Sequence, residues 1–67
     1  MITIEVNGKP IQCNYECTVE EYVVSLGLET KHVAVAHNGV VLGRTQFSQI
    51  RLSQGDTLEI VRPVGGG

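Results

Sequence analysis

The chain ends in three consecutive glycines, Gly65, Gly66 and Gly67, and so in a carboxylate that no side chain crowds. A free carboxylate is a poor electrophile, and sulfur or any other nucleophile can displace its oxygen only after activation. Because glycine has no Cβ and adopts many backbone conformations, such a tail can enter a narrow channel. Chain ends are also often frayed without any function. The tail therefore indicates chemistry at Gly67 only if the rest of the chain supports that role.

The other reactive side chains do not form a recognisable catalytic or metal-binding pattern. Cys13 and Cys17 are separated by three residues, which is not the C-x-x-C redox spacing. A zinc site needs four ligands, and only scattered carboxylates accompany His32 and His37. We interpret Cys13 as a strand residue, Cys17 as a neighbour of a helix cap, His32 as a loop residue and His37 as a strand end. We therefore expect no catalytic residues, no metal site and no bound cofactor.

Composition excludes several classes of protein. With 67 residues the chain forms one domain at most, and its small core cannot enclose a deep active site. The net charge is −2 and no basic run is present, so we do not expect nucleic-acid binding. No apolar stretch approaches the ~20 residues that span a membrane. The first residues do not resemble a signal peptide, so we expect a cytoplasmic protein whose cysteines are reduced.

The first part of the chain predicts a hairpin and then a helix. Apolar residues alternate from Ile2 to Val6, Asn7-Gly8 is a strong hairpin signal, and residues 9–13 form the returning strand. Pro10 lacks an amide donor, which places this second strand at an edge of the sheet. Thr18 and Glu21 form a capping box before an apolar helical stripe of Val19, Tyr22, Val23 and Leu26. We predict a helix over about residues 19–26, closed by Gly27 as its C′ residue.

The second part predicts three more strands. They cover residues 33–37, 40–42 and 57–62, with a second Asn-Gly turn at 38–39, a short 3₁₀ turn within 45–50 and a polar turn at 53–56. A hairpin, one helix and further strands predict an α+β fold, in which a mixed sheet of about five strands carries one helix across it. This arrangement is a β-grasp. We predict a domain over residues 1–63, followed by a flexible glycine-rich tail over 64–67.

Nearly the whole chain resembles the thiamine-biosynthesis sulfur carriers, the ThiS family of ubiquitin-like β-grasp proteins. The resemblance rests on the order and spacing of the stretches 18–21, 33–39, 40–44, 52–61 and 62–67, the last of which is Arg-Pro-Val-Gly-Gly-Gly. The chain departs from the usual family pattern at His37, Gly43 and Phe47. None of these residues belongs to the tail, so the departures do not affect the chemistry that the resemblance implies.

The resemblance implies that Gly67 carries sulfur. In that family, a ubiquitin-activating-like adenylyltransferase consumes ATP to adenylate the terminal carboxylate, and a cysteine desulfurase relay supplies the sulfur that converts it to a thiocarboxylate. The thiocarboxylate then donates its sulfur to thiazole synthase. Gly65 and Gly66 would be the flexible approach to the partner's active site. The chain would be a protein cosubstrate on which partner enzymes act.

A docking surface is also predicted from the phase of the last strand. Val61 and Val64 fall out of phase with Leu58 and Ile60, and we expect them on the open face of the sheet, where apolar patches mark binding surfaces. We expect Val40 and Phe47 to join this patch. Arg62 lies beside the tail and is a further candidate for contact with a partner.

Three other functions are compatible with the residues. Sulfur carriers for molybdopterin, cysteine or tRNA thiolation share the tail chemistry, although the compact length and the stretch 38–44 favour thiamine. A ubiquitin-like protein modifier would begin with the same acyl adenylate but end in lysine conjugates. A plain β-grasp interaction module would use no tail chemistry at all.

Overall fold

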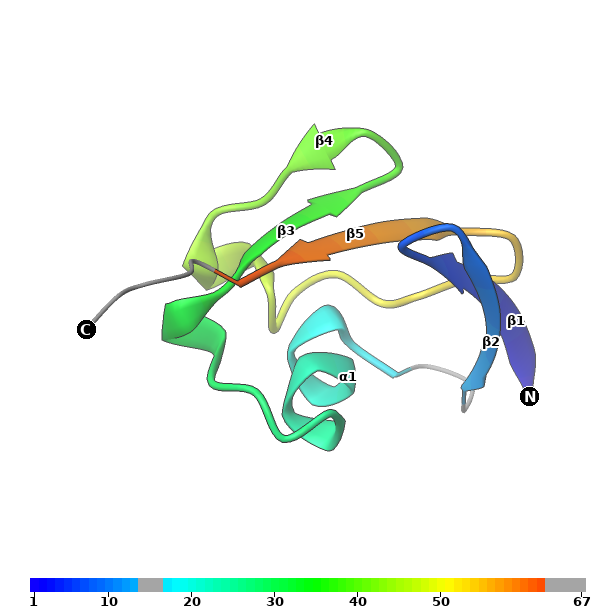
Figure 1. Ribbon diagram of the computed structural model, residues 1–67, viewed down its shortest axis with the longest axis horizontal. Helices are drawn as coiled ribbons and strands as arrows, with labels where there is room; N and C mark the ends of the chain where they lie inside the picture. Colours follow the sequence, from blue (N-terminus) through cyan, green and yellow to red (C-terminus); the bar gives the residue numbers. More distant parts are fainter. Residues whose placement is uncertain (14–16, 63–67) are drawn as a thin grey trace.

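The computed structural model describes residues 1–13 and 17–62, and these form a five-stranded mixed sheet with one helix across one face (Figure 1). The elements are β1 (Ile2–Val6), β2 (Lys9–Cys13), α1 (Val19–Ser25), η1 (Thr30–His32), β3 (Ala34–His37), β4 (Val40–Val41), η2 (Arg44–Gln46) and β5 (Thr57–Val61). The predicted α+β fold and its mixed sheet with one helix are confirmed. The predicted domain boundary at residue 63 lies outside the described residues.

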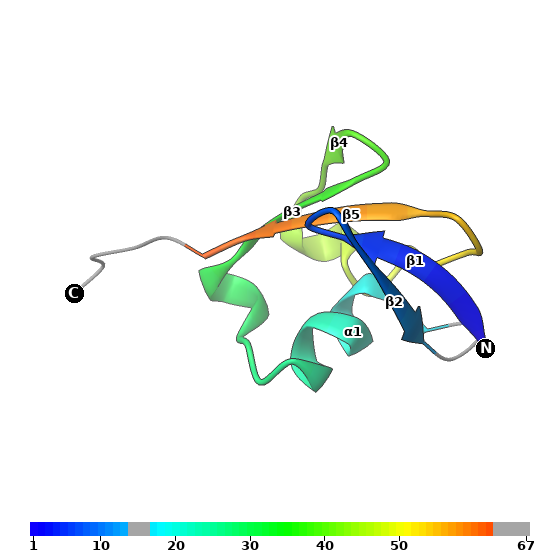
Figure 2. The ribbon, with the colours of Figure 1, turned by 45° about the vertical axis from the view of Figure 1, so that its right-hand side comes forward.

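The last strand occupies the centre of the sheet. The strand order is β2-β1-β5-β3-β4, in which β5 runs parallel to β1 and antiparallel to β3. The edge position predicted for β2 from Pro10 is confirmed, because β2 pairs with β1 alone. Figure 2 shows α1 on one side of the sheet, while the other side is left open.

Both Asn-Gly turns have the predicted hairpin geometry, and their asparagines also bind β5. Asn7 and Asn38 have φ values of 50° and 49°, and each following glycine has a φ of 85°. The Asn7 side chain accepts a hydrogen bond from the Ile60 amide (2.8 Å) and donates one to the Ile60 carbonyl (3.2 Å). The Asn38 side chain accepts a hydrogen bond from the Thr57 amide (2.8 Å). The two turns thus fasten opposite ends of the central strand.

The helix begins and ends as the sequence predicts. The Thr18 hydroxyl accepts from the Glu21 amide (3.1 Å), and the Glu21 carboxylate accepts from the Thr18 amide (2.9 Å). At the C-terminus, Gly27 has a φ of 79° and donates to the Val24 carbonyl, while the Leu28 amide donates to the Val23 carbonyl. This is a Schellman cap. The helix ends at Ser25 with Leu26 as its cap residue, close to the predicted end at 26.

Phe47 belongs to the core, so its predicted place in an exposed patch is wrong. Its side chain is 2% exposed and joins a cluster formed by β1, β3, β5 and α1. The physical reason is the position of the segment after η2, which lies against the N-terminus of α1. The Phe47 and Ile50 carbonyls accept hydrogen bonds from the Glu20 and Val19 amides, which are donors that a helix N-terminus leaves unpaired.

The bond between Asn7 and β5 gives a first prediction. In the Asn7→Gly variant the positive φ costs nothing, but both side-chain hydrogen bonds to Ile60 are lost. We expect the free energy of unfolding to fall by about 1–2 kcal/mol, measured by urea denaturation. Gly8→Ala is the control for backbone strain, since a Cβ there meets no atom but sits at a positive φ. An unchanged stability of Asn7→Gly would show that the turn does not depend on these bonds.

Candidate functional site

The candidate site is the place where β5 ends and the chain continues towards its glycines. Arg62 is the last described residue, directly after the end of β5 at Val61. The predicted sulfur-carrying residue Gly67, the flexible approach of Gly65 and Gly66, and the docking residue Val64 all lie outside the described residues. What the structure shows is the surface from which the tail departs.

An apolar groove lies on the open face of the sheet beside this point. It has a volume of about 180 Å³ and is lined by Ala34, Val35, Ala36, Val41, Glu59 and Val61. Val61 lies opposite Ala34 and Val41 lies opposite Ala36 in the strand register, so both valines share one face. Their exposed fractions are 61% and 74%, which is unusual for valine. The structure therefore places Val61 on the open face, as the phase of the strand predicts.

Val40 is exposed, but it does not line this groove. The register places Val40 opposite His37, which is one residue out of phase with Ala36 and so on the other face of the sheet. Val40 is nevertheless 62% exposed because β4 is an edge strand of only two residues. The neighbouring Val41 takes the position on the open face. The sequence alone could not distinguish the two valines, because the pairing register of such a short strand is set by its partner.

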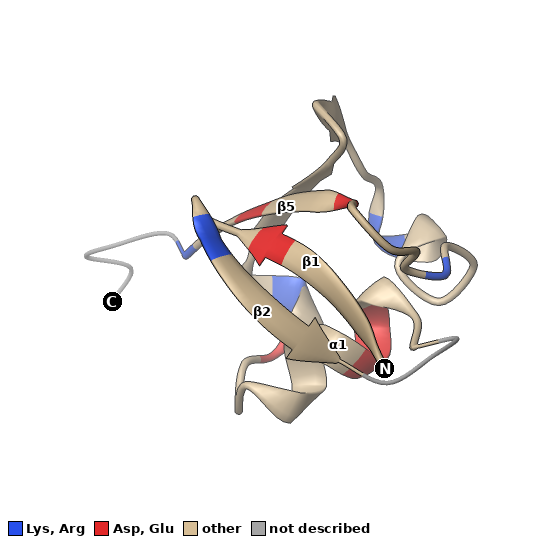
Figure 3. Cartoon of the chain, turned by 90° about the vertical axis from the view of Figure 1, so that its right-hand side faces the viewer, with Lys and Arg blue, Asp and Glu red and all other residues tan. Residues whose placement is uncertain are grey.

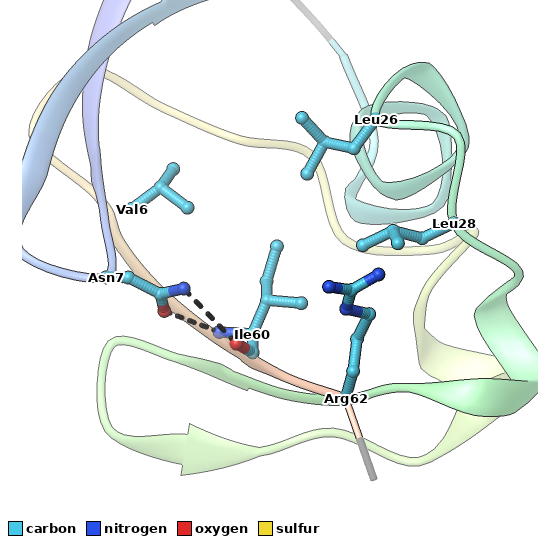
Figure 4. Close-up of a pocket in the computed structure, with 6 residues that line it drawn as sticks. All are labelled: Val6, Asn7, Leu26, Leu28, Ile60 and Arg62. Atoms are coloured by element: carbon cyan, nitrogen blue, oxygen red, sulfur yellow. Dashed lines mark hydrogen bonds between the residues drawn. The ribbon is translucent and has the colours of Figure 1, made fainter. Parts of the chain in front are cut away.

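A second hollow lies on the helix side of the same strand end. Figure 4 shows its six lining residues, which come from the end of β1, the end of α1 and the end of β5. It has a volume of about 320 Å³ and is lined by Val6, Asn7, Leu26, Leu28, Ile60 and Arg62. The Arg62 side chain points into it towards Leu28, and the paired hydrogen bonds of Asn7 to Ile60 form its floor (Figure 4). Only Arg62 of this set was predicted as a site residue.

The charges around the two concavities differ in sign. The open face carries Glu59 in the groove and Glu5 on the neighbouring strand, and Figure 3 shows these acidic positions on β5 and β1. On the helix side, Arg62 is the charged residue that lines the hollow. Consecutive residues of a strand point to opposite faces, so Glu59 and Val61 face one way and Arg62 the other.

The sequence did not predict one polar cluster, which lies elsewhere in the fold. Nε2 of His37 lies 2.8 Å from Oδ2 of Asp56, and the Ser53 amide and the Asn38 side chain donate to the same carboxylate at 2.9 and 3.3 Å. Burial acts to raise the pKa of Asp56, but the hydrogen bonds from His37, Ser53 and Asn38 outweigh it, so this pKa lies below its usual range. The cluster joins the turn after β3 to the start of β5 and holds these two segments together.

The described residues contain no other arrangement with catalytic character. Burial raises the pKa of both thiols, Cys13 and Cys17, so neither is an activated nucleophile. Within residues 1–13 and 17–62, no three His, Cys, Asp or Glu side chains gather as a metal would require. No helix in this part of the chain is long and apolar enough to cross a membrane. The arrangement places the end of β5 and Arg62 between two concave surfaces.

Comparisons with known proteins agree with the fold. The crystal structure of the thiamine biosynthesis protein ThiS from Geobacter metallireducens superposes with a TM-score of 0.83, at 32% sequence identity, over 98% of this chain and all of that one. The fold and the surface at its strand end thus define a ubiquitin-like β-grasp protein. The family model of the ThiS family matches residues 3–67, and the chain belongs to that family.

Individual relatives agree with the family assignment. The sulfur carrier protein ThiS of Bacillus subtilis is 32% identical over 96% of this chain and 98% of its own length. A thiazole synthase of Paramagnetospirillum magneticum is 34% identical over 92% of this chain, which spans only 19% of that synthase. The chain is therefore a sulfur carrier of thiamine biosynthesis, a small carrier protein, as its resemblance to the family predicted.

The low pKa of Asp56 gives a prediction about acid stability. Because the folded-state pKa is depressed, the carboxylate stabilises the fold above its ordinary pKa of about 4, and this contribution is lost as the pH falls below that value. Asp56→Asn should lower the free energy of unfolding by about 1–3 kcal/mol at pH 7, with a smaller difference at pH 3, measured by urea denaturation. Glu59→Gln is the exposed control. A difference that is the same at both pH values would contradict the assignment.

Proposed function

We propose that the terminal carboxylate of Gly67 is the sulfur-carrying group. One of its oxygens attacks the α-phosphorus of ATP, pyrophosphate leaves, and an acyl adenylate is formed. A sulfide equivalent then attacks the acyl carbon and AMP leaves, which produces a thiocarboxylate. The observation that carries this proposal is the match to the ThiS family, which runs to residue 67 and so includes all three terminal glycines.

Partner enzymes supply the catalysis in this proposal. A ubiquitin-activating-like adenylyltransferase holds ATP over the carboxylate and consumes it, and a cysteine desulfurase relay delivers sulfur. The carrier binds no cofactor of its own. Gly65 and Gly66 let the chain end reach the partner's active site, because residues without a Cβ fit a narrow channel. We expect these steps in the cytoplasm, where free thiols such as Cys13 and Cys17 stay reduced.

Thiazole synthase is the proposed acceptor of the sulfur. The support comes from the thiazole synthases of Paramagnetospirillum magneticum and Magnetococcus marinus, each of which matches this chain over about a fifth of its own length (19% and 20%). In these proteins a carrier-like sequence and a thiazole synthase belong to one chain. A separate carrier and synthase would have to bind each other to achieve the same proximity.

The docking surface proposed for these partners is the open-face groove. Val61 and Val41 expose apolar area beside the root of the tail, and Ala34 and Ala36 leave room between them for a partner's side chain. Exposed apolar side chains of this kind mark interaction sites in otherwise polar surfaces. A partner bound here would lie next to Arg62, which is one residue beyond the end of β5.

Mass spectrometry of the intact protein tests the chemistry. The carrier is incubated with the adenylyltransferase, ATP, a cysteine desulfurase, cysteine and a thiol that reduces the delivered persulfide sulfur to the sulfide level. It should gain one sulfur in place of one oxygen, localised to Gly67 by fragmentation. Gly66→Val should abolish the exchange, because the added side chain blocks the channel, while Val24→Ala on the exposed side of α1 should not affect it. A wild-type carrier that forms no acyl adenylate would overturn the proposal, and lysine conjugates would favour a protein modifier.

Replacement of Val61 tests the docking surface. Val61→Asp should lower the affinity for the adenylyltransferase or the synthase at least about tenfold, since a charge then enters an apolar contact. The fold should remain stable within about 0.5 kcal/mol, because the side chain is 61% exposed. Val24→Asp places the same charge on the helix, at a side chain that is 58% exposed, and serves as the matched control. Equal affinities for both variants would exclude the groove as the contact.

A further inference from the structure

The hollow on the helix side of β5 has the character of a binding site for a charged partner residue. Leu26 and Leu28 at the end of α1 and Ile60 on β5 supply its apolar lining, while Asn7 and the Arg62 guanidinium make much of its surface polar (Figure 4). Leu26 is 47% exposed although it closes the helix as its cap residue. An aliphatic side chain could cover the apolar lining while a carboxylate beside it reaches the guanidinium.

Arg62 is the cation that lines this hollow. The Lys31 ammonium lies 3.5 Å from the Glu29 carboxylate, and the Arg44 guanidinium donates a hydrogen bond to the Lys31 carbonyl. Within the described ranges 1–13 and 17–62, by contrast, Arg62 has no hydrogen bond or ion pair. Guanidinium groups bind carboxylates through two parallel hydrogen bonds, which favours a carboxylate as the ligand.

The opposite face of the same strand end carries the opposite charge. Glu59 lines the open-face groove together with Val61, and within the described residues its carboxylate also lacks an ion pair. A protein that encloses the end of β5 therefore meets an apolar groove with an anion on one face, and a hollow of mixed polarity with a cation on the other. This charge pattern favours one orientation of the partner. If the partner were rotated by half a turn about the axis of β5, its cation would face Arg62 and its anion would face Glu59.

We propose that the hollow formed by Leu26, Leu28, Ile60 and Arg62 is a second docking site, which receives a carboxylate side chain and a neighbouring aliphatic side chain of the adenylyltransferase. The same enzyme presents a cation to Glu59 on the other face. This inference rests on the proposed function, because it assumes that the adenylyltransferase binds the carrier around Val61 and Arg62, where the tail begins. The two charges set the direction in which the tail enters the enzyme, and the side chains of Leu26, Leu28 and Ile60 supply contact area.

Calorimetric titration of the full-length carrier with the adenylyltransferase tests the proposal. Arg62→Glu should weaken binding at least about thirtyfold, because a desolvated ion pair becomes a repulsion, and Arg62→Gln should weaken it less. Lys31→Glu makes the same change in net charge at a nearby exposed position and should weaken binding less than about threefold. Leu26→Ser, which alters an apolar wall without changing charge, should weaken binding between about three- and tenfold.

A double variant separates the charge pattern from the net charge. Glu59→Lys with Arg62→Glu keeps the net charge at −2 but exchanges the signs on the two faces. We expect it to bind at least as poorly as Arg62→Glu and to show the same thermal midpoint as the wild type. Wild-type affinity of the double variant, or equal losses for Arg62→Glu and Lys31→Glu, would overturn the proposal and leave only general electrostatic attraction.

Two further readouts separate this inference from its alternatives. If removal of Gly66 and Gly67 shifts the Arg62 side-chain NMR signal of the free carrier, the chain's own carboxylate occupies the hollow and the assignment to a partner is wrong. At saturating adenylyltransferase, Arg62→Glu should still form the thiocarboxylate. A wild-type carrier that forms none would instead overturn the proposed function, so the two failures are distinguishable.

Discussion

The fold depends on the pairing of β5 between β1 and β3, which lie far from it in the sequence. Two asparagines complete this pairing where the strand ladders end: Asn7 bonds to Ile60 on one side and Asn38 bonds to Thr57 on the other. Each asparagine has a positive φ because of its turn, and that conformation directs its side chain onto the central strand. One residue type therefore both reverses the chain and holds the strand that leads to the tail.

The central position of β5 also explains why a small domain has two different surfaces at the end of this strand, one on each face of the sheet. A strand exposes alternate residues to opposite faces, so successive side chains near its end meet different surroundings. In this protein Ile60 faces the helix and helps to close the core, whereas Val61 faces the open side of the sheet. Within the described residues the buried side chains form one small core, and both concavities lie on its surface.

Local signals in the sequence predicted most of the fold. The Thr18–Glu21 capping box, the Gly27 cap and both Asn-Gly turns involve residues within a few positions of one another, and each has the expected geometry. Phe47 was misplaced because its burial depends on contact with the N-terminus of α1, about 27 residues earlier in the chain. The hollow around Arg62 was not predicted either, because its walls come from three elements that meet only in the folded protein.

The parallel pairing of β1 with β5 has a consequence for the synthesis of the protein. Glu5 and Val6 pair with Thr57 and Leu58. The strand that the ribosome makes first, β1, therefore cannot form this pairing until β5 has been synthesised. Until β5 emerges, β1 and β3 each lack a neighbour, and contacts of such sequence separation form late. A chain interrupted before β5 cannot close its sheet and remains open to degradation. A stable domain therefore requires a chain that extends through β5, the strand that leads to Arg62.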